Sequence, residues 1–138
     1  MRWMVLASIL VFAMIVGVLV VSNPGEAPDE TQQRNRVAMI MTGFRNDHSW
    51  NESHFDALQK AEKDLNLEVA YYENVPADST AQGIMEQAIR NGAKIVIANS
   101  YGFGEAELQV ARNHPEVKFF HATGLQSATN FSSFFGRV

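Results

Sequence analysis

The feature that most constrains this chain is a regular alternation of short apolar runs and amphipathic helical segments after residue 35. Five runs have the length and composition of buried strands: residues 36–41, 67–72, 94–98, 117–121 and 131–135. Three segments between the first four runs carry apolar residues at helical spacing: residues 50–66, 80–91 and 105–113. The runs lack polar alternation, which is typical of strands covered on both faces. The order therefore predicts an α/β fold, a doubly wound parallel sheet in three layers.

Capping residues mark the ends of the predicted helices. Ser49 precedes the first helix and Glu52 follows three residues later, which fits a capping box. Asp78 or Ser79 is expected to cap the second helix. Gly92 fits the position just beyond the end of that helix.

The first 22 residues have a different character from the rest of the chain. Arg2 precedes an uncharged apolar run over residues 3–21, close to the length that spans a bilayer as a helix. This run fits an uncleaved signal anchor with Arg2 on the cytoplasmic side, or a long signal peptide cut after Ser22 or Ala27. A buried core helix is the third alternative. Residues 23–35 are polar and contain two prolines, which predicts a flexible linker.

Both membrane-targeting interpretations of residues 1–22 place the globular domain, residues 36–138, outside the cytoplasm. The domain is expected to be anchored in the cell membrane if the apolar run is retained. It is expected to be secreted or periplasmic if the run is cleaved.

The loops that follow the strands hold the candidate ligand-binding residues, because ligands of such sheets bind beyond the carboxyl ends of the strands. Aromatic and polar side chains gather in and after the first loop: Phe44, Asn46, Asp47 and Trp50. The second loop has a glycine-aromatic composition that lets backbone approach a ligand: Ser100, Tyr101 and Gly102. The alternative is structural: Trp50 packs the helix on the sheet, Asp47 caps it, and the second loop is a plain turn.

Several functional classes lack support in the sequence. The net charge is −4 and the basic residues are scattered, which argues against nucleic-acid binding. The chain has no cysteine and its four histidines lack metal-site spacing, so we expect no metal. We find no nucleophile–base motif and no phosphate loop, and expect no enzyme activity and no cofactor. His121 ends a strand at the ligand edge, where an ordinary polar role is the simpler interpretation.

Five motifs give the domain a family resemblance. They are NDHSW (46–50), YENVP (72–76), IVIANSYGFGEAELQVA (95–111), HPEVKFFHATG (114–124) and NFSSFFGRV (130–138). The sequence resembles the basic membrane protein family, the PnrA-like substrate-binding proteins of ABC transporters. The resemblance implies a type I periplasmic-binding-protein fold, in which two lobes close on a purine base or nucleoside. Because family members are about twice as long as this domain, it implies that residues 36–138 are a truncated N-terminal lobe.

The resemblance also assigns roles to residues. It implies that Trp50 stacks on the base, that Ser100, Tyr101 and Gly102 contact the ligand, and that Thr123 and Gly124 contribute from the turn after the fourth strand. The leading hypothesis is therefore solute capture and delivery to an ABC permease. The alternative is a membrane-anchored domain that senses a ligand for a signalling partner, and an enzyme is the third and weakest.

Overall fold

The computed structural model describes residues 34–136, and in this part of the chain the α/β fold is confirmed. The strands are β1 (Arg36–Ile40), β2 (Glu68–Tyr72), β3 (Ile95–Ala98), β4 (Lys118–Ala122) and β5 (Phe131–Phe134). The helices are α2 (Trp50–Asp64), α3 (Thr80–Arg90), α4 (Gly104–Asn113) and the 3₁₀ turn η1 (Tyr101–Phe103). The apolar segment at residues 1–22 and most of the linker lie outside the described residues.

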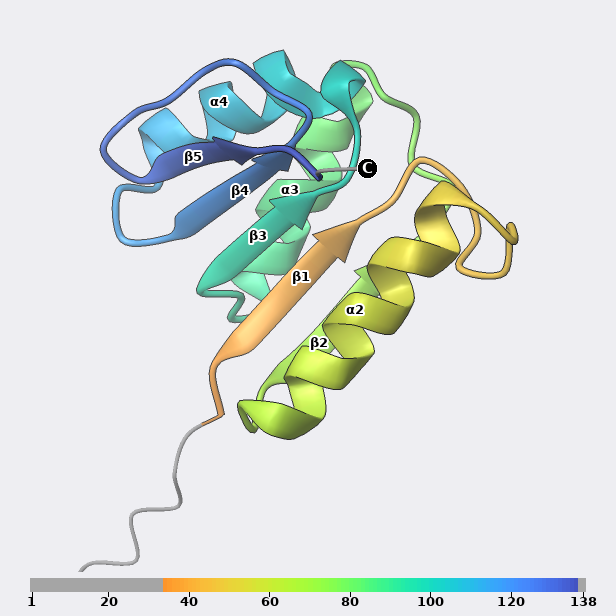
Figure 1. Ribbon diagram of the computed structural model, residues 1–138. Coiled ribbons are helices and arrows are strands. Elements are labelled where there is room, and N and C mark those ends of the chain that lie inside the picture. Colours follow the sequence, from red (N-terminus) through yellow and green to blue (C-terminus); the bar gives the residue numbers. More distant parts are fainter. Residues whose placement is uncertain (1–33, 137–138) are drawn as a thin grey trace, which may run out of the picture. The chain divides into compact units, whose positions relative to one another are not determined.

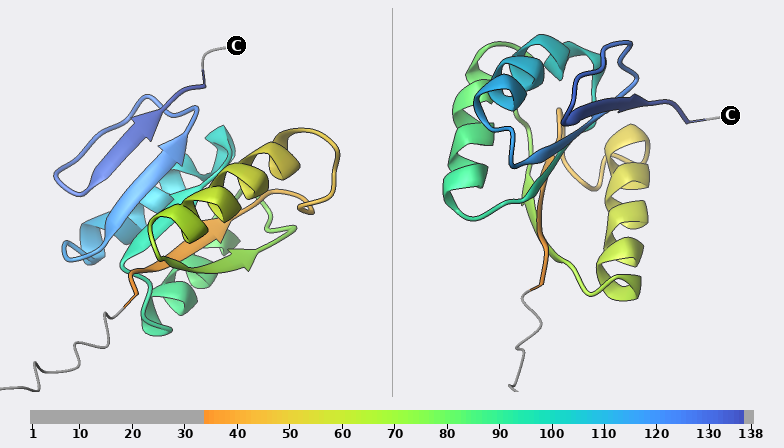
Figure 2. Two further views of the ribbon diagram at one scale, coloured as in Figure 1. Left: turned by 60° about the horizontal axis from the view of Figure 1, so that its bottom comes forward. Right: turned by 90° about the vertical axis from the view of Figure 1, so that its left-hand side faces the viewer.

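The five strands form one parallel sheet in the order β2-β1-β3-β4-β5. Helix α2 lies on one face, beside β1 and β2, and α3 and α4 lie on the other face (Figures 1 and 2). The chain thus has the three layers expected of a doubly wound sheet. Residues 123–130 join β4 to the parallel strand β5 without a helix. Parallel neighbours usually need a longer crossover, so this loop is unusually short.

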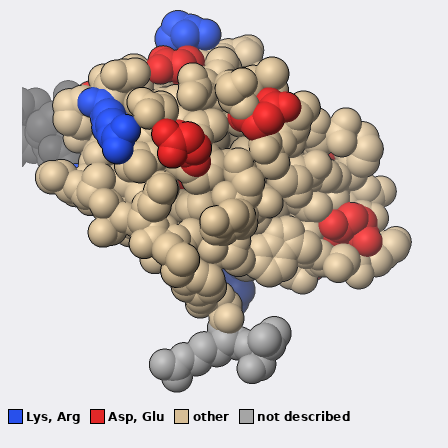
Figure 3. All heavy atoms as spheres, turned by 90° about the horizontal axis from the view of Figure 1, so that it is seen from above, with Lys and Arg blue, Asp and Glu red and all other residues tan. Residues whose placement is uncertain are grey.

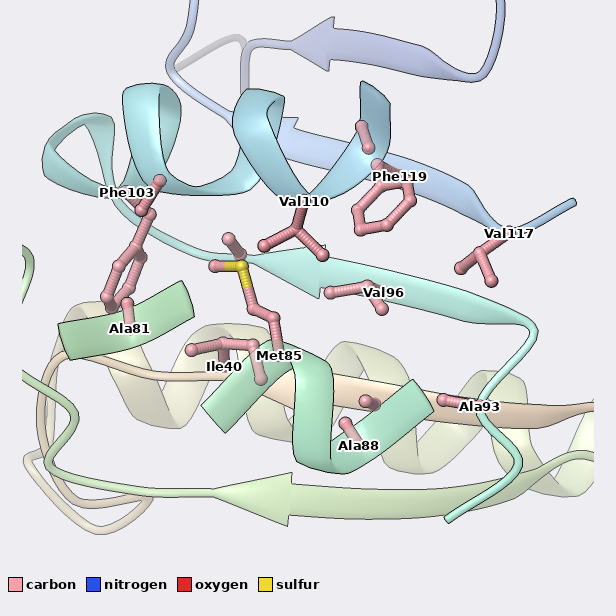
Figure 4. Packing of buried hydrophobic residues seen from close by; sticks show 14 of the residues in the cluster. Ile40, Ala81, Met85, Ala88, Ala93, Val96, Phe103, Val110, Val117 and Phe119 are labelled. Carbon is pink, nitrogen blue, oxygen red and sulfur yellow. The ribbon is translucent and has the colours of Figure 1, made fainter. Parts of the chain in front are cut away.

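The core lies between the sheet and the α3–α4 layer. Ala38 and Ile40 of β1 belong to it, together with Met85 of α3 and Phe119 of β4 (Figure 4). Successive side chains of a strand point to opposite faces. The alternate residues Val37, Met39 and Met41 are also buried, although they lie outside this cluster. Residues 37–41 are therefore covered on both faces, as the unbroken apolar run predicted.

Helix α2 is the least buried of the three α-helices. Its apolar residues Phe55, Leu58 and Ala61 are half-buried, and Leu65 just beyond it is exposed. Within the helix only Asn51, a polar residue, is buried. The amphipathic pattern located this helix correctly but did not indicate how little of it would be covered.

The predicted capping box at the start of α2 is wrong. Ser49 makes no side-chain capping hydrogen bond. The carboxylate of Asp47 takes this role and accepts hydrogen bonds from the backbone N–H groups of Ser49, Asn51 and Glu52. A carboxylate has two oxygens and more acceptor capacity than a hydroxyl, so one side chain serves three donors. Asp78 similarly accepts hydrogen bonds from the N–H and hydroxyl groups of Thr80, and Gly92 has the expected positive φ of 96°.

Candidate functional site

The carboxyl ends of β1, β3 and β4 lie side by side at one edge of the sheet, here called the rim (Figure 1). Ile40 of β1 pairs with Ala98 of β3, and Ala98 pairs with His121 of β4. The loops that follow, residues 41–49, 99–103 and 123–130, therefore start from neighbouring points. This is the arrangement that the strand order in the sequence predicted.

Two buried asparagines hold the first and second loops together. The Asn99 side chain, which is fully buried, donates from Nδ2 to Asn51 Oδ1 at 2.8 Å and accepts from the Thr42 N–H at 3.2 Å. Asn51 in turn donates to Asp47 at 2.8 Å and accepts from the Gly43 N–H at 3.3 Å. Each amide has both a donor and an acceptor, so the pair can link two loops without leaving a polar atom unpaired. Neither asparagine was among the predicted site residues.

This network explains the charge state of Asp47. Desolvation acts to raise the pKa of its carboxyl. The hydrogen bonds from the Glu52 backbone, from the side chain and backbone of Asn51, and from the Ser49 backbone outweigh it and lower the pKa to about 2. A hydrogen bond to the charged form favours ionisation. Of the two interpretations of Asp47, the capping one describes its backbone contacts, and the hydrogen bond from the Asn51 side chain links it to the asparagine pair.

Trp50 is attached to the second loop by its own ring nitrogen. The indole Nε1–H donates to the backbone carbonyl of Asn99 at 2.5 Å, and 42% of the residue stays exposed. The His54 ring meets the indole edge-on, with ring centroids 4.5 Å apart. Burial lowers the pKa of His54, which favours the neutral ring at pH 7. Trp50 is thus neither a core residue nor a free one: its polar end is fixed and its ring is partly open to solvent.

The second loop reaches the rim as an extended residue followed by a tight turn. Ser100 has extended backbone, and Tyr101, the first residue of η1, is 69% exposed. A Cβ on Gly102 would lie 2.8 Å from the Cβ of Ala77, in the loop before α3. A glycine is therefore required here for packing between loops, which is the structural alternative raised for this turn.

The turn after β4, which carries Thr123 and Gly124, also has a constrained backbone. Thr123 has a φ of +64°, which is rare for a β-branched residue, and its N–H donates to the Phe134 carbonyl at 2.8 Å. Its hydroxyl donates to the carbonyl of Ala122 at 2.6 Å. Gly124 follows and is buried. Such strained residues persist where surrounding contacts hold them, and they often occur at functional sites.

Four of the predicted site residues, Trp50, Tyr101, Gly102 and Gly124, border one of two separate hollows at the rim, whereas Asp47, Ser100 and Thr123 line neither. The first, about 420 Å³, lies at the first turn of α2 and is bordered by Trp50, His48 and Asp56 among others. The second, called the rim hollow below, has about 460 Å³ and is lined by Tyr101, Gly102, Gly104, Glu105, His121, Gly124, Leu125 and Gln126. Trp50 and Tyr101 therefore do not share a hollow, although the Trp50 indole is hydrogen-bonded to Asn99, two residues before Tyr101. Phe44, 57% exposed, and Asn46, also exposed, lie on the first loop and line neither hollow.

A larger hollow of about 620 Å³ lies at the opposite edge of the sheet, around Arg36, Ala93 and the start of β2. Two of its charged groups are engaged with each other: Arg36 forms an ion pair with Glu68 at 2.7 Å and also donates to the carbonyl of Asn91. In doubly wound sheets the amino ends of the strands serve structure, whereas ligands bind at the carboxyl ends. We therefore place the candidate site at the rim.

The view from above in Figure 3, onto the side toward which the strands point, shows a mostly uncharged surface with separate acidic and basic side chains. Within residues 34–136 no group of three or more histidine, aspartate or glutamate side chains is placed to hold a metal ion. In the same range no helix combines the length and the apolar character required to cross a membrane.

The fold matches part of solved solute-binding proteins. A solute-binding protein of an ABC transporter from Conexibacter woesei superposes with a TM-score of 0.63 at 25% identity, over 72% of this chain and 34% of that one. A second, from Aeropyrum pernix, superposes with a TM-score of 0.64 at 19% identity, over 72% and 28% of the two chains, and supports the fold alone.

Sequence comparison identifies the family. Residues 34–138 match the family described as ABC transporter substrate-binding protein PnrA-like, and the chain belongs to this family. A purine-binding protein of Brucella abortus is 30% identical over 108 residues, which cover 77% of this chain and 31% of that protein. A Haloferax volcanii protein named as an ABC transporter glucose-binding protein is 27% identical over 118 residues, covering 85% and 30%. The chain thus spans about a third of the length of these two relatives.

Proposed function

We propose that this chain is part of an extracytoplasmic solute-binding protein that captures a purine base or nucleoside at the rim and delivers it to an ABC permease. The observation that carries the proposal is the state of Trp50. Its Nε1–H is held by the Asn99 carbonyl while 42% of the residue remains exposed. A planar aromatic surface held in place before the ligand arrives loses little conformational freedom on binding. The family and the purine-binding relative support a purine as the ligand.

The other contacts would come from the second loop and the following turn. Tyr101, Gly102 and Gly124 line the rim hollow, whose volume of about 460 Å³ lies within the range of small-molecule sites. Ser100 and Thr123 flank these residues and carry hydroxyl groups. Phe44 and Asn46 would approach the ligand from the first loop. Asp47 would act indirectly, by fixing the helix turn that carries Trp50.

Calorimetric titration of the full-length protein with adenine, guanine, adenosine and guanosine tests the proposal. Base–aromatic stacking contributes roughly 1–3 kcal/mol, so Trp50→Ala is expected to weaken binding about 5- to 150-fold. Leu65→Ala is the matched control, because this exposed residue follows α2 at the end away from Trp50. Equal binding by the Trp50→Ala and Leu65→Ala variants, or no binding of any of the four compounds, would refute the assignment.

A sugar is the second candidate ligand, because one relative is named as glucose-binding. An aromatic ring such as that of Trp50 also packs against the apolar face of a sugar ring. Glucose therefore belongs in the same titration. Saturable glucose binding that purines do not displace would replace the purine proposal with this one.

The location of the protein forms part of the proposal. We infer that residues 1–22 direct the domain across the cytoplasmic membrane, either as a retained anchor or as a cleaved signal peptide. N-terminal sequencing of the exported protein distinguishes these outcomes. A start at Met1 indicates the anchor, and a start at Asn23 or Pro28 indicates cleavage. Recovery of the domain in the cytoplasm would contradict both.

A further inference from the structure

His121, at the carboxyl end of β4, connects the two segments that border the rim hollow. Its ring is buried, with 2% of the residue exposed, and Nε2 lies 2.9 Å from the carbonyl oxygen of Ser100. The same oxygen accepts the N–H of Phe103 at 3.0 Å, a hydrogen bond that closes the turn η1. One carbonyl therefore anchors both the turn that presents Tyr101 and the imidazole of β4.

Two glycines make room for this ring. A Cβ on Gly104 would lie 2.6 Å from Cε1 of His121, and a Cβ on Gly124 would lie 2.1 Å from Nδ1. Both distances are far below van der Waals contact, so a side chain at either position would displace the ring or the loop. His121 is thus enclosed between the start of α4 and the turn that follows β4.

The hydrogen bond to Ser100 fixes the protonation pattern of the neutral ring. A carbonyl oxygen only accepts, so Nε2 must carry the hydrogen, and Nδ1 is left as an acceptor. Among the described residues Nδ1 is buried without a hydrogen-bond partner. A buried unpaired acceptor costs free energy. The hydrogen bond from Nε2 to the Ser100 carbonyl offsets part of this cost, and an apolar residue could not make it.

We propose that His121 is a positioning residue of the ligand site: its Nε2–H holds the Ser100 carbonyl and so keeps the segment 100–103 at a fixed spacing from the turn at Gly124. The inference rests on the proposed function, since the rim hollow is the space that this spacing defines. His121 itself need not touch the ligand. Loss of the Nε2 donor is expected to loosen η1 and to weaken binding without unfolding the domain.

A pair of amide substitutions in the full-length protein tests this role. The amide nitrogen of His121→Gln lies near the original Nε2 and can still donate to Ser100. The amide nitrogen of His121→Asn lies near Nδ1 and cannot reach it. Both variants are polar and neutral, so they share the cost of burial. Adenine affinity is measured by calorimetry, and hydrogen exchange of the Phe103 amide is measured without ligand.

The expected result is a separation of the two variants. His121→Asn should speed exchange at Phe103 and weaken adenine binding at least tenfold, whereas His121→Gln should stay within about threefold of the wild type in both. Equal behaviour of the two variants, or exchange at Phe103 that neither changes, overturns the inference. If the wild type binds no purine but the exchange rates separate as expected, the proposed ligand is wrong while the positioning of η1 by His121 stands.

Nitrogen NMR of the wild type must also show the hydrogen on Nε2, and a hydrogen on Nδ1 would overturn the proposal.

Discussion

Glu107, in the first turn of α4, offers a quantitative test of the energetics of this fold. Its side chain is fully buried, and within the described residues neither carboxylate oxygen has a hydrogen-bond partner. Desolvation by burial raises the pKa of Glu107 well above its ordinary value of 4.5, which favours the protonated carboxyl in the folded protein. Even the neutral form leaves polar atoms unpaired, at a cost of roughly 1–3 kcal/mol.

The substitution Glu107→Met should therefore stabilise the domain. Methionine has a similar volume and adapts to irregular space, so the packing cost should stay small. We expect a gain of about 1–3 kcal/mol in the free energy of unfolding. For a domain of this size that corresponds to a rise of at least about 4 °C in Tm.

The gain should also depend on pH. The unfolded chain releases the Glu107 proton near pH 4.5, whereas the folded chain retains it to higher pH. Below pH 4.5 both states hold the proton, so the group adds no pH-dependent cost there, and above pH 4.5 the fold loses stability as pH rises toward the folded-state pKa. Linkage limits the loss to about 1.4 kcal/mol per pH unit. The advantage of Glu107→Met over the wild type should consequently widen as pH rises above 4.5.

Urea unfolding of the full-length protein at several pH values, followed by circular dichroism, measures both effects. Glu107→Gln is the matched control, because it removes the titration but keeps an unpaired polar group. It should lose the pH dependence and gain less than the methionine variant. If Glu107→Met is less stable than the wild type at pH 7, the carboxyl has a stabilising partner and the reasoning fails.

Three further substitutions test the rim. Asp47→Ala should destabilise the protein at pH 7; because the folded pKa of Asp47 is about 2 and its ordinary value is 3.8, the contribution is present above about pH 4 and is lost as pH falls toward 2. If the free energy of unfolding of the variant falls between pH 4 and 2 as much as that of the wild type, the prediction is wrong. Asn99→Ala leaves buried partners unpaired and should cost about 1–3 kcal/mol in chemical unfolding, whereas an unchanged midpoint would show that the amide network is dispensable. Gly102→Ala should cost about 1–3 kcal/mol because its Cβ would meet Ala77 at 2.8 Å, and a neutral effect would show that the loop yields easily.

The order of strands and helices was predictable from the sequence because it rests on local patterns. Apolar runs located all five strands, including β5, and the spacing of apolar residues located α2, α3 and α4. The position of the rim followed from topology, since parallel strands present their carboxyl ends at the same edge. These features need no knowledge of which side chain meets which.

The details of the candidate site were less predictable because they depend on contacts between distant residues. Ser49 fitted the capping pattern, but Asp47 two residues earlier reaches the same N–H groups with a stronger acceptor. The link between Asn51 and Asn99 joins residues 48 positions apart, and no periodicity indicates it. The only signal for Asn99 was a polar residue directly after a wholly apolar strand.

The division of the predicted residues between two hollows has the same origin. Trp50 and Tyr101 both follow strands at the rim, so topology placed them near each other. The hydrogen bond to the Asn99 carbonyl holds the indole of Trp50, and this residue borders the hollow at the first turn of α2. Tyr101 borders the rim hollow with His121 instead. A ligand that contacts both must extend past residues 99 and 100.

Fluorescence of Trp50 tests the central claim most directly. The chain has one other tryptophan, Trp3, so the signal of Trp50 is taken as the difference in emission between the Trp3→Phe variant of the full-length protein and the double variant that also carries Trp50→Phe. The account predicts a saturable change in its emission on addition of adenine or adenosine, with the same affinity that calorimetry gives. Emission that stays unchanged while calorimetry shows purine binding would place the ligand away from Trp50 and contradict the account.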